Sequence, residues 1–151
     1  MQPNVLNPYV VNKSVAIAAP KEAVWEALTN PTLTKKYFFH CGVFSNWKPG
    51  DKISFKGRIF LVKKIEMNGK ILQINPGSLL KYTLTNRSSD GGDSVSTVTD
   101  RLKFEHGKTI LTVTDDVGEG PGAEKRYERS LKGWDKILQG LKKVVESRNP
   151  S

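Results

Sequence analysis

The sequence has almost none of the residues that form covalent or metal cross-links. Cys41 is the only cysteine among 151 residues, so no disulfide can form within the chain and a cysteine-based zinc site is disfavoured. The only two histidines, His40 and His106, make a poor metal site. We therefore expect neither a metal nor another cofactor.

Long hydrophobic runs are also missing. No stretch approaches the ~18 consecutive apolar residues that a membrane-spanning helix needs, so we expect no membrane span. The first residues, MQPNVLNPYVVNKS, contain no basic start followed by an apolar run, so we expect no secretion signal. Together with the lone thiol, this favours a cytoplasmic location.

The sequence contains no P-loop, no dinucleotide-binding glycine fingerprint and no serine nucleophile elbow. The net charge is +9, and the largest local excess of positive charge lies in residues 48–70. This segment contains seven Lys or Arg and only two acids, Asp51 and Glu66. A second basic excess lies in residues 121–151. Such surfaces attract acidic proteins, nucleic acids or anionic surfaces, although a solvated lysine-rich surface has the same composition. Without a nucleic-acid-binding motif, we expect no specific nucleic acid partner.

The first half of the chain predicts one strand and two short helices. Residues 11–18 alternate as a strand, with Val11, Val15 and Ile17 on one face. Pro20 suits the first turn of a helix over KEAVWEALT, which Asn30-Pro31 ends. A second short helix is expected over TLTKKYF.

Residues 43–117 alternate as strands joined by short turns, which predicts an antiparallel meander. In DKISFKGRIFL, the residues Ile53, Phe55, Ile59 and Leu61 share a face. Asn68-Gly69 predicts a two-residue hairpin. Further turns are expected at Pro76-Gly77, in the loop RSSDGGDS and at residues 106–108.

Residues 123–147 predict a helix of about five turns. Its apolar residues follow alternating spacings of four and three, which gives one continuous stripe: Tyr127, Leu131, Trp134, Leu138, Leu141 and Val145. Only the sheet is large enough to cover this stripe. The order of elements is therefore that of an α+β helix-grip fold, with residues 1–10 as an arm, 11–147 as one domain and 148–151 as a tail.

Several segments resemble proteins similar to the activator of heat-shock protein 90 ATPase. They are IAAPKEAVWEALTNP, YFF at 37–39, WKPGDKISF, GKILQINPGSLLKYTLT, TILTVTD and GWDKILQGLKKVVE. In order and spacing they cover about residues 11–146. The resemblance implies membership of the START-like (SRPBCC, Bet v 1-like) superfamily, in which the sheet wraps the last helix and often leaves a cavity for an apolar ligand.

This sequence departs from the family pattern at two places. Pro49-Gly50-Asp51 stands where a Gly-Gly pair is common, and Asp100 stands where an apolar or aromatic residue is common. On a period of two, Asp100 shares a face with Val98, Leu102 and Phe104. If this face is inward, Asp100 is a candidate anchor for the polar group of a ligand. The alternatives are that a bulge or strand end turns it to solvent, or that it pairs with Arg101 or Arg87.

The expected ligand site combines this acid with aromatic and aliphatic walls. Such walls serve either a pocket for an apolar molecule or a filled core. We predict a site formed by Phe39, Trp47, Phe55, Tyr82, Asp100, Phe104, Trp134 and Leu138. No catalytic residues are expected, since the adjacent His40 and Cys41 would have to meet to form a nucleophilic pair and have no third orienting group.

Three functions remain open at this stage. The first is a binding domain for an apolar small molecule, either a lipid or an aromatic compound. The second is an interaction domain for a chaperone or another acidic protein. The third is a cyclase or hydrolase acting in the cavity, which requires at least two converging polar groups.

Overall fold

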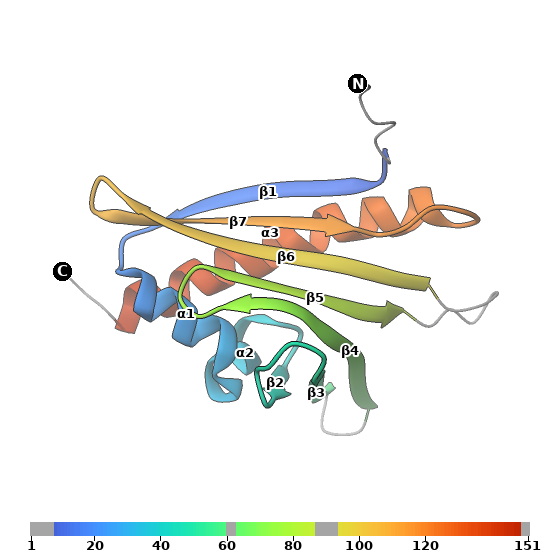
Figure 1. Ribbon diagram of the computed structural model, residues 1–151, viewed down its shortest axis with the longest axis horizontal. Helices are drawn as coiled ribbons and strands as arrows, with labels where there is room; N and C mark the ends of the chain where they lie inside the picture. Colours follow the sequence, from blue (N-terminus) through green and yellow to red (C-terminus); the bar gives the residue numbers. More distant parts are fainter. Residues whose placement is uncertain (1–7, 60–62, 87–93, 149–151) are drawn as a thin grey trace.

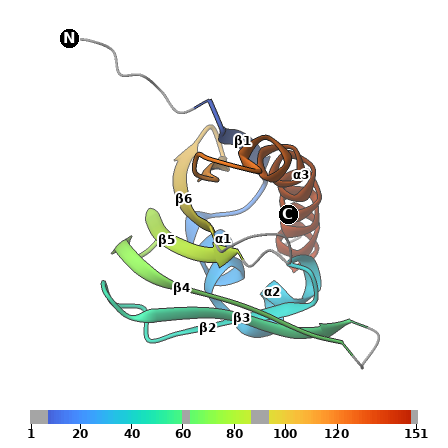
Figure 2. The same cartoon turned by 90° about the vertical axis from the view of Figure 1, so that its right-hand side faces the viewer.

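The computed structural model describes residues 8–59, 63–86 and 94–148. A seven-stranded antiparallel sheet, in the order β1-β7-β6-β5-β4-β3-β2, curves around a long helix (Figures 1 and 2). The strands are β1 Val10–Ile17, β2 Cys41–Ser45, β3 Lys52–Ile59, β4 Lys63–Asn75, β5 Leu79–Asn86, β6 Ser94–Glu105 and β7 Lys108–Asp116. The helices are α1 Lys21–Thr29, α2 Pro31–Tyr37 and α3 Ala123–Arg148. The predicted α+β helix-grip fold is confirmed.

The long helix α3 lies across the concave side of the sheet, as Figure 2 shows end-on. Its buried residues are Trp134, Ile137, Leu138, Leu141 and Val145, with Ala123 at its start. The predicted stripe is therefore the buried face, although Tyr127 and Leu131 are only partly buried and Ile137 was not assigned to it. In the described part of the chain, no helix is both long and apolar enough to cross a membrane.

Asn30 joins the two short helices without an intervening loop. Its backbone N–H donates to the carbonyl of Glu26 and ends α1, while its Oδ1 accepts from the N–H of Thr32 and begins α2. Pro31 fits the first position of α2 because that position needs no N–H donor. This junction fixes α2 beside α3, with Tyr37 against Gly140.

The hairpin predicted at Asn68-Gly69 is wrong. Both residues lie inside the single long strand β4, which pairs with β3 through residues 63–70 and with β5 through residues 71–75, after an irregularity between Ile71 and Gln73. Gly69 is needed here because a Cβ would overlap the carbonyl oxygen of Thr83 on β5. The glycine therefore reflects a close backbone approach rather than a turn.

Other parts of the predicted meander agree with the structure. The turn at Pro76-Gly77 is present, and Gly77 has the positive φ that such a turn requires. Leu80, Tyr82 and Leu84 share the buried face of β5. The predicted position of Leu61 and the loop at 87–93 lie outside the described residues. The short strand β2 was not separated from its surroundings in the sequence.

Two Gly→Ala substitutions test this account of the sheet. Gly69→Ala should lower the free energy of unfolding by about 3 kcal/mol, because overpacking against a strand backbone forces the strands apart. Gly133→Ala is the matched control, since its Cβ would meet only the ring edge of Phe39 at 3.6 Å. Because Gly133 lies in a helix, Gly133→Ala should raise the free energy of unfolding by about 0.5–1 kcal/mol. Urea unfolding measures both, and equal stabilities would contradict the close approach at Gly69.

Candidate ligand-binding site

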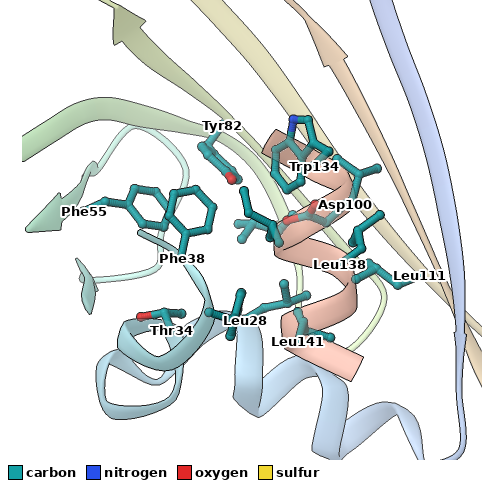
Figure 3. A pocket seen from close by; sticks show the side chains of 14 residues that line it. Leu28, Thr34, Phe38, Phe55, Tyr82, Asp100, Leu111, Trp134, Leu138 and Leu141 are labelled. Carbon is teal, nitrogen blue, oxygen red and sulfur yellow. The ribbon is translucent and has the colours of Figure 1, made fainter. Parts of the chain in front are cut away.

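A small cavity lies between the inner face of the sheet, α2 and α3 (Figure 3). Its volume is about 20 Å³, which is room for about one water molecule. The lining is apolar apart from one carboxyl group and three hydroxyls. The lining residues are Leu28, Thr34, Tyr37, Phe38, Phe55, Leu80, Tyr82, Asp100, Leu111, Val113, Trp134, Ile137, Leu138 and Leu141.

Strand alternation and helix periodicity bring these residues together. On β5, β6 and β7 every second side chain points to the concave face, which supplies Tyr82, Asp100 and Val113. Helix α3 contributes Trp134 and Leu138, which lie one turn apart. The cavity is therefore assembled from segments that are distant in sequence.

Aromatic rings form one wall of the cavity. Phe38 stacks on Phe55 with ring centroids 4.5 Å apart, and meets Trp134 edge-on at 6.1 Å. Phe55 in turn lies 5.9 Å from Tyr82. Figure 3 shows the hydroxyl of Tyr82 pointing into the space between these rings and Asp100. The rings give the site a flat, apolar wall with one polar end.

Asp100 is the acid that the sequence singled out, and it points inward. Its exposed fraction is 2%, and its Oδ1 has no hydrogen-bond partner. Burial raises the pKa of Asp100 to about 7, and the negative charge of Asp115 contributes to this rise. Near neutral pH this carboxyl group therefore exists in both its charged and neutral forms. The alternative that a bulge turns Asp100 to solvent is wrong.

Asp115 lies diagonally across from Asp100 on the same inner face. Asp100 pairs in register with Val113, and Asp115 with Val98. Asp115 Oδ2 accepts hydrogen bonds from Ser130 Oγ at 2.6 Å and from Trp134 Nε1 at 2.9 Å, while its Oδ1 has no partner. Burial raises the pKa of Asp115, and the two hydrogen bonds from α3 oppose that rise.

Two tyrosines face Asp100 from other elements. Burial raises the pKa of the Tyr37 and Tyr82 hydroxyls well above the ordinary value, and the charge of Asp100 adds to both shifts. Both hydroxyls therefore stay neutral in the physiological range. Tyr37 Oη donates to the carbonyl of Ala27 at 2.6 Å, so it is already engaged with α1.

Five of the eight predicted site residues line the cavity, and three do not. Phe55, Tyr82, Asp100, Trp134 and Leu138 line it. The predictions for Phe39, Trp47 and Phe104 need correction, each for a different reason.

Backbone conformation places Phe39 and Trp47 elsewhere. Phe39 has φ 50° in the turn after α2 and is 45% exposed over α3, near Gly133. Trp47, with φ 61°, lines an open surface hollow of about 430 Å³ together with Pro31 and Phe44. Neither left-handed conformation follows from a residue type that favours it.

Strand register explains the position of Phe104. Strand β5 pairs with β6 only over residues 94–101, so Phe104 lies beyond the end of β5. Its side chain is 49% exposed although it shares the alternation of Asp100. Figure 1 shows the β6–β7 hairpin extending past the end of β5.

The sequence also held signals for several lining residues that the predicted site left out. Leu80 alternates with Tyr82, which was assigned to the site, and Ile137 adjoins Leu138 on the helix. Tyr37 and Phe38 belong to an aromatic cluster whose direction depends on the turn after α2. The lining residues outside the predicted set are Leu28, Thr34, Tyr37, Phe38, Leu80, Leu111, Val113, Ile137 and Leu141.

His40 and Cys41 do not form a nucleophilic pair. The Cys41 side chain is fully buried, and its Sγ donates to the carbonyl of Phe39 at 3.5 Å. Burial raises the pKa of the Cys41 thiol, so the reactive thiolate is disfavoured. His40 is exposed and has φ 61°.

The family model for Activator of Hsp90 ATPase homolog 1-like protein matches residues 18–146. The chain belongs to this family. The family is a branch of the START-like (SRPBCC) superfamily, as the resemblance implied. A search of curated proteins gives no match.

Solved structures of similar shape come from several bacteria. ChR145 from Cytophaga hutchinsonii is 34% identical, with a TM-score of 0.72, and 94% of this chain covers 97% of that one. MLL2253 from Mesorhizobium loti is 22% identical, with a TM-score of 0.79 and coverage of 94% and 99%. An AHSA1-like protein from Aeromonas hydrophila is 20% identical, with a TM-score of 0.70 and coverage of 91% and 94%. The last two likenesses concern the fold alone.

The burial of Asp100 predicts an unusual pH dependence of stability. Below about pH 4 both folded and unfolded states carry the proton. Between about pH 4 and pH 7 only the folded state keeps it, so this group makes the fold less stable as pH rises. Above pH 7 the penalty is constant. A pKa of about 7 against 3.8 corresponds to about 4 kcal/mol.

Asp100→Asn should remove this penalty, since the amide is neutral at every pH. We expect the variant to gain stability over the wild type by a few kcal/mol at about pH 8, and to match it near pH 4. Asp135→Asn is the control, because the Asp135 side chain is 63% exposed in an ion pair with Lys13. Thermal and urea unfolding across this pH range measure the difference in stability. If the pKa of Asp100 were close to the ordinary value of 3.8, the two proteins would not differ in this way.

Proposed function

We propose that this domain binds a small, largely apolar molecule between its sheet and α3, with Asp100 as the anchor for the polar group of that molecule. One observation carries the proposal: Asp100 Oδ1 is buried without a partner in the lining of a largely apolar, aromatic cavity. An unsatisfied buried carboxyl oxygen costs stability. A bound polar group would offset that cost.

Binding requires the cavity to widen, because about 20 Å³ admits no organic molecule. The turn after α2 is the segment that would yield. Phe39 and His40 both hold positive φ there, at a cost of about 1–2 kcal/mol each. Phe38, which precedes them, forms part of the aromatic wall. Relaxation of this turn would swing the Phe38 ring away from Phe55 and enlarge the site.

Filling the cavity from its own wall tests this function. Val113→Phe should abolish the thermal shift that lipid-like or aromatic ligands cause, because the added ring occupies the space beside Asp100. Val98→Phe is the control, since Val98 is equally buried on the same sheet face but does not line the cavity. The two variants should lose similar stability by overpacking, about 1–3 kcal/mol. Native mass spectrometry identifies any ligand carried through purification. Unchanged binding by Val113→Phe contradicts the proposed site.

A second candidate function is contact with an acidic protein surface, such as that of a chaperone. The strand register favours it, because Lys52 faces Lys70 and Arg58 faces Lys64 across β3 and β4. Like charges directly opposite one another destabilise a sheet, and all four side chains are exposed. An anionic partner would relieve this repulsion. The description of the matching family model points to the same class of partner.

Charge reversal on this strand face tests the second candidate. Lys64→Glu with Lys70→Glu should abolish salt-sensitive capture of purified heat-shock protein 90, because the contact is electrostatic. Lys132→Glu with Lys136→Glu changes the charge by the same amount on the exposed side of α3. Equal capture by the two double variants and the wild type, at low and high salt, argues against this partner.

A further inference from the structure

Asp100 and Asp115 place two carboxyl groups on one buried patch of the sheet. Their exposed fractions are 2% and 7%. Each has an Oδ1 without a hydrogen-bond partner. Among the ion pairs found in the described residues, neither acid takes part. When these acids are ionised the cavity carries negative potential, and no ion pair among the described residues balances it.

The two acids differ in what they can offer a ligand. Asp115 Oδ2 is already held by Ser130 and Trp134 of α3, and Asp115 is not part of the cavity lining. Asp100 lines the cavity directly. Asp100 is thus the contact group, and Asp115 is a second negative charge behind it.

We propose that the ligand of this site is an amphipathic amine, whose ammonium group donates to Asp100 while its apolar body lies against Phe38, Phe55 and Trp134. This inference rests on the proposed function. An ammonium group brings up to three donors and the positive charge that the site lacks. Aromatic ring faces also attract cations. An anionic ligand would instead meet the repulsion of both acids.

None of the described neighbours of Asp100 supplies a positive charge, so that charge would have to come from the ligand. Tyr82 from β5 and Tyr37 from α2 face it as neutral hydroxyls, and Asp115 from β7 faces it as an acid. Helix α3 presents Trp134, Ile137, Leu138 and Leu141 to the cavity, all uncharged. Within the described lining no Lys, Arg or His is present.

The inference has a second, independent consequence: binding should release a proton. Burial holds the pKa of Asp100 at about 7, so near pH 7 about half of the molecules carry the proton. An ammonium ion needs the ionised carboxylate. The protonated acid and the ammonium ion therefore combine to give a carboxylate–ammonium pair, and one proton leaves to solvent. The average release near pH 7 is about half a proton per ligand.

Three probes of one shape separate this inference from the proposed function. They are 2-phenylethylamine, the neutral propylbenzene and the anionic 3-phenylpropanoate. Binding of any of them to the wild-type domain tests the proposed function. The relative affinities of the three probes test the inference that the ligand is an amine. The same comparison can be made in Leu138→Ala. Removing this lining side chain leaves a larger void beside Asp100, so the cavity needs less widening to admit a probe.

We expect 2-phenylethylamine to bind at least ten-fold more tightly than propylbenzene, in the wild type and in Leu138→Ala. Asp100→Asn should reduce this preference below about two-fold while propylbenzene still binds, because the amide keeps the shape and loses the charge. Asp135→Asn, which removes an exposed charge, should keep the preference. Calorimetry in buffers of different ionisation enthalpy should give about half a proton released near pH 7, and almost none at about pH 8.5.

Two results would overturn the inference alone: equal affinity for the amine and propylbenzene, or tighter binding of 3-phenylpropanoate. The second would mean that Asp100 acts as a protonated donor to an anion. If no probe binds to the wild type or to Leu138→Ala, the proposed function falls and the inference falls with it.

Discussion

The anchoring of α3 to the sheet through Asp115 is the constraint on which the interior depends. Trp134 Nε1 and Ser130 Oγ both donate to one oxygen of this carboxyl group. Hydrogen bonds to a charged group are worth about 1.5–3 kcal/mol each, so they fix the position of α3 along β7. That position sets which helix residues face Asp100: the apolar Leu138 and Leu141 one and two turns beyond Trp134. The helix therefore donates two hydrogen bonds to one oxygen of Asp115, while Asp100 Oδ1 remains without a hydrogen-bond partner.

Much of the fold follows from periodicity alone. The stripe from Trp134 to Val145 and the alternation around Tyr82 predict their buried faces correctly, because each has a single large surface to cover. Alternation also places Asp100 on the face of Val98 and Leu102, but it leaves open whether a bulge turns the side chain to solvent. What periodicity does not contain is where a strand ends relative to its neighbour. Phe104 continues the inward alternation, yet it is exposed because β5 stops short of it.

Backbone geometry accounts for the other differences. Asn68-Gly69 has the composition of a hairpin, but the glycine is required by the close approach of the β5 backbone at Thr83, a contact between separate strands. The left-handed conformations of Phe39 and Trp47 are imposed by tertiary packing, since neither residue type favours them. They redirect the aromatic cluster after α2, so Phe38 lines the cavity and Phe39 does not. No local pattern distinguishes these two neighbours.

Membership of the family accounts for the architecture, and the unusual chemistry of this chain lies on the inner face of β6 and β7, where Asp100 and Asp115 are buried. A fold of this kind hosts many functions, so the chemistry has to be argued from the site. Here the site combines an aromatic wall, a nearly filled cavity and a buried carboxyl oxygen without a hydrogen-bond partner. The two like-charged pairs on β3 and β4 lie on a separate, exposed surface. Binding inside the grip and contact on that outer strand face are therefore compatible in one domain.

The central claim is that Asp100 is a buried, uncompensated acceptor aimed into the cavity. The most direct measurement is a carbon NMR titration of the Asp100 carboxyl group, with and without 2-phenylethylamine. We predict a midpoint at about pH 7 in the free protein, shifted downward when the amine is bound because an adjacent positive charge favours the ionised form. A midpoint near the ordinary value of 3.8, unchanged by the amine, would contradict the account.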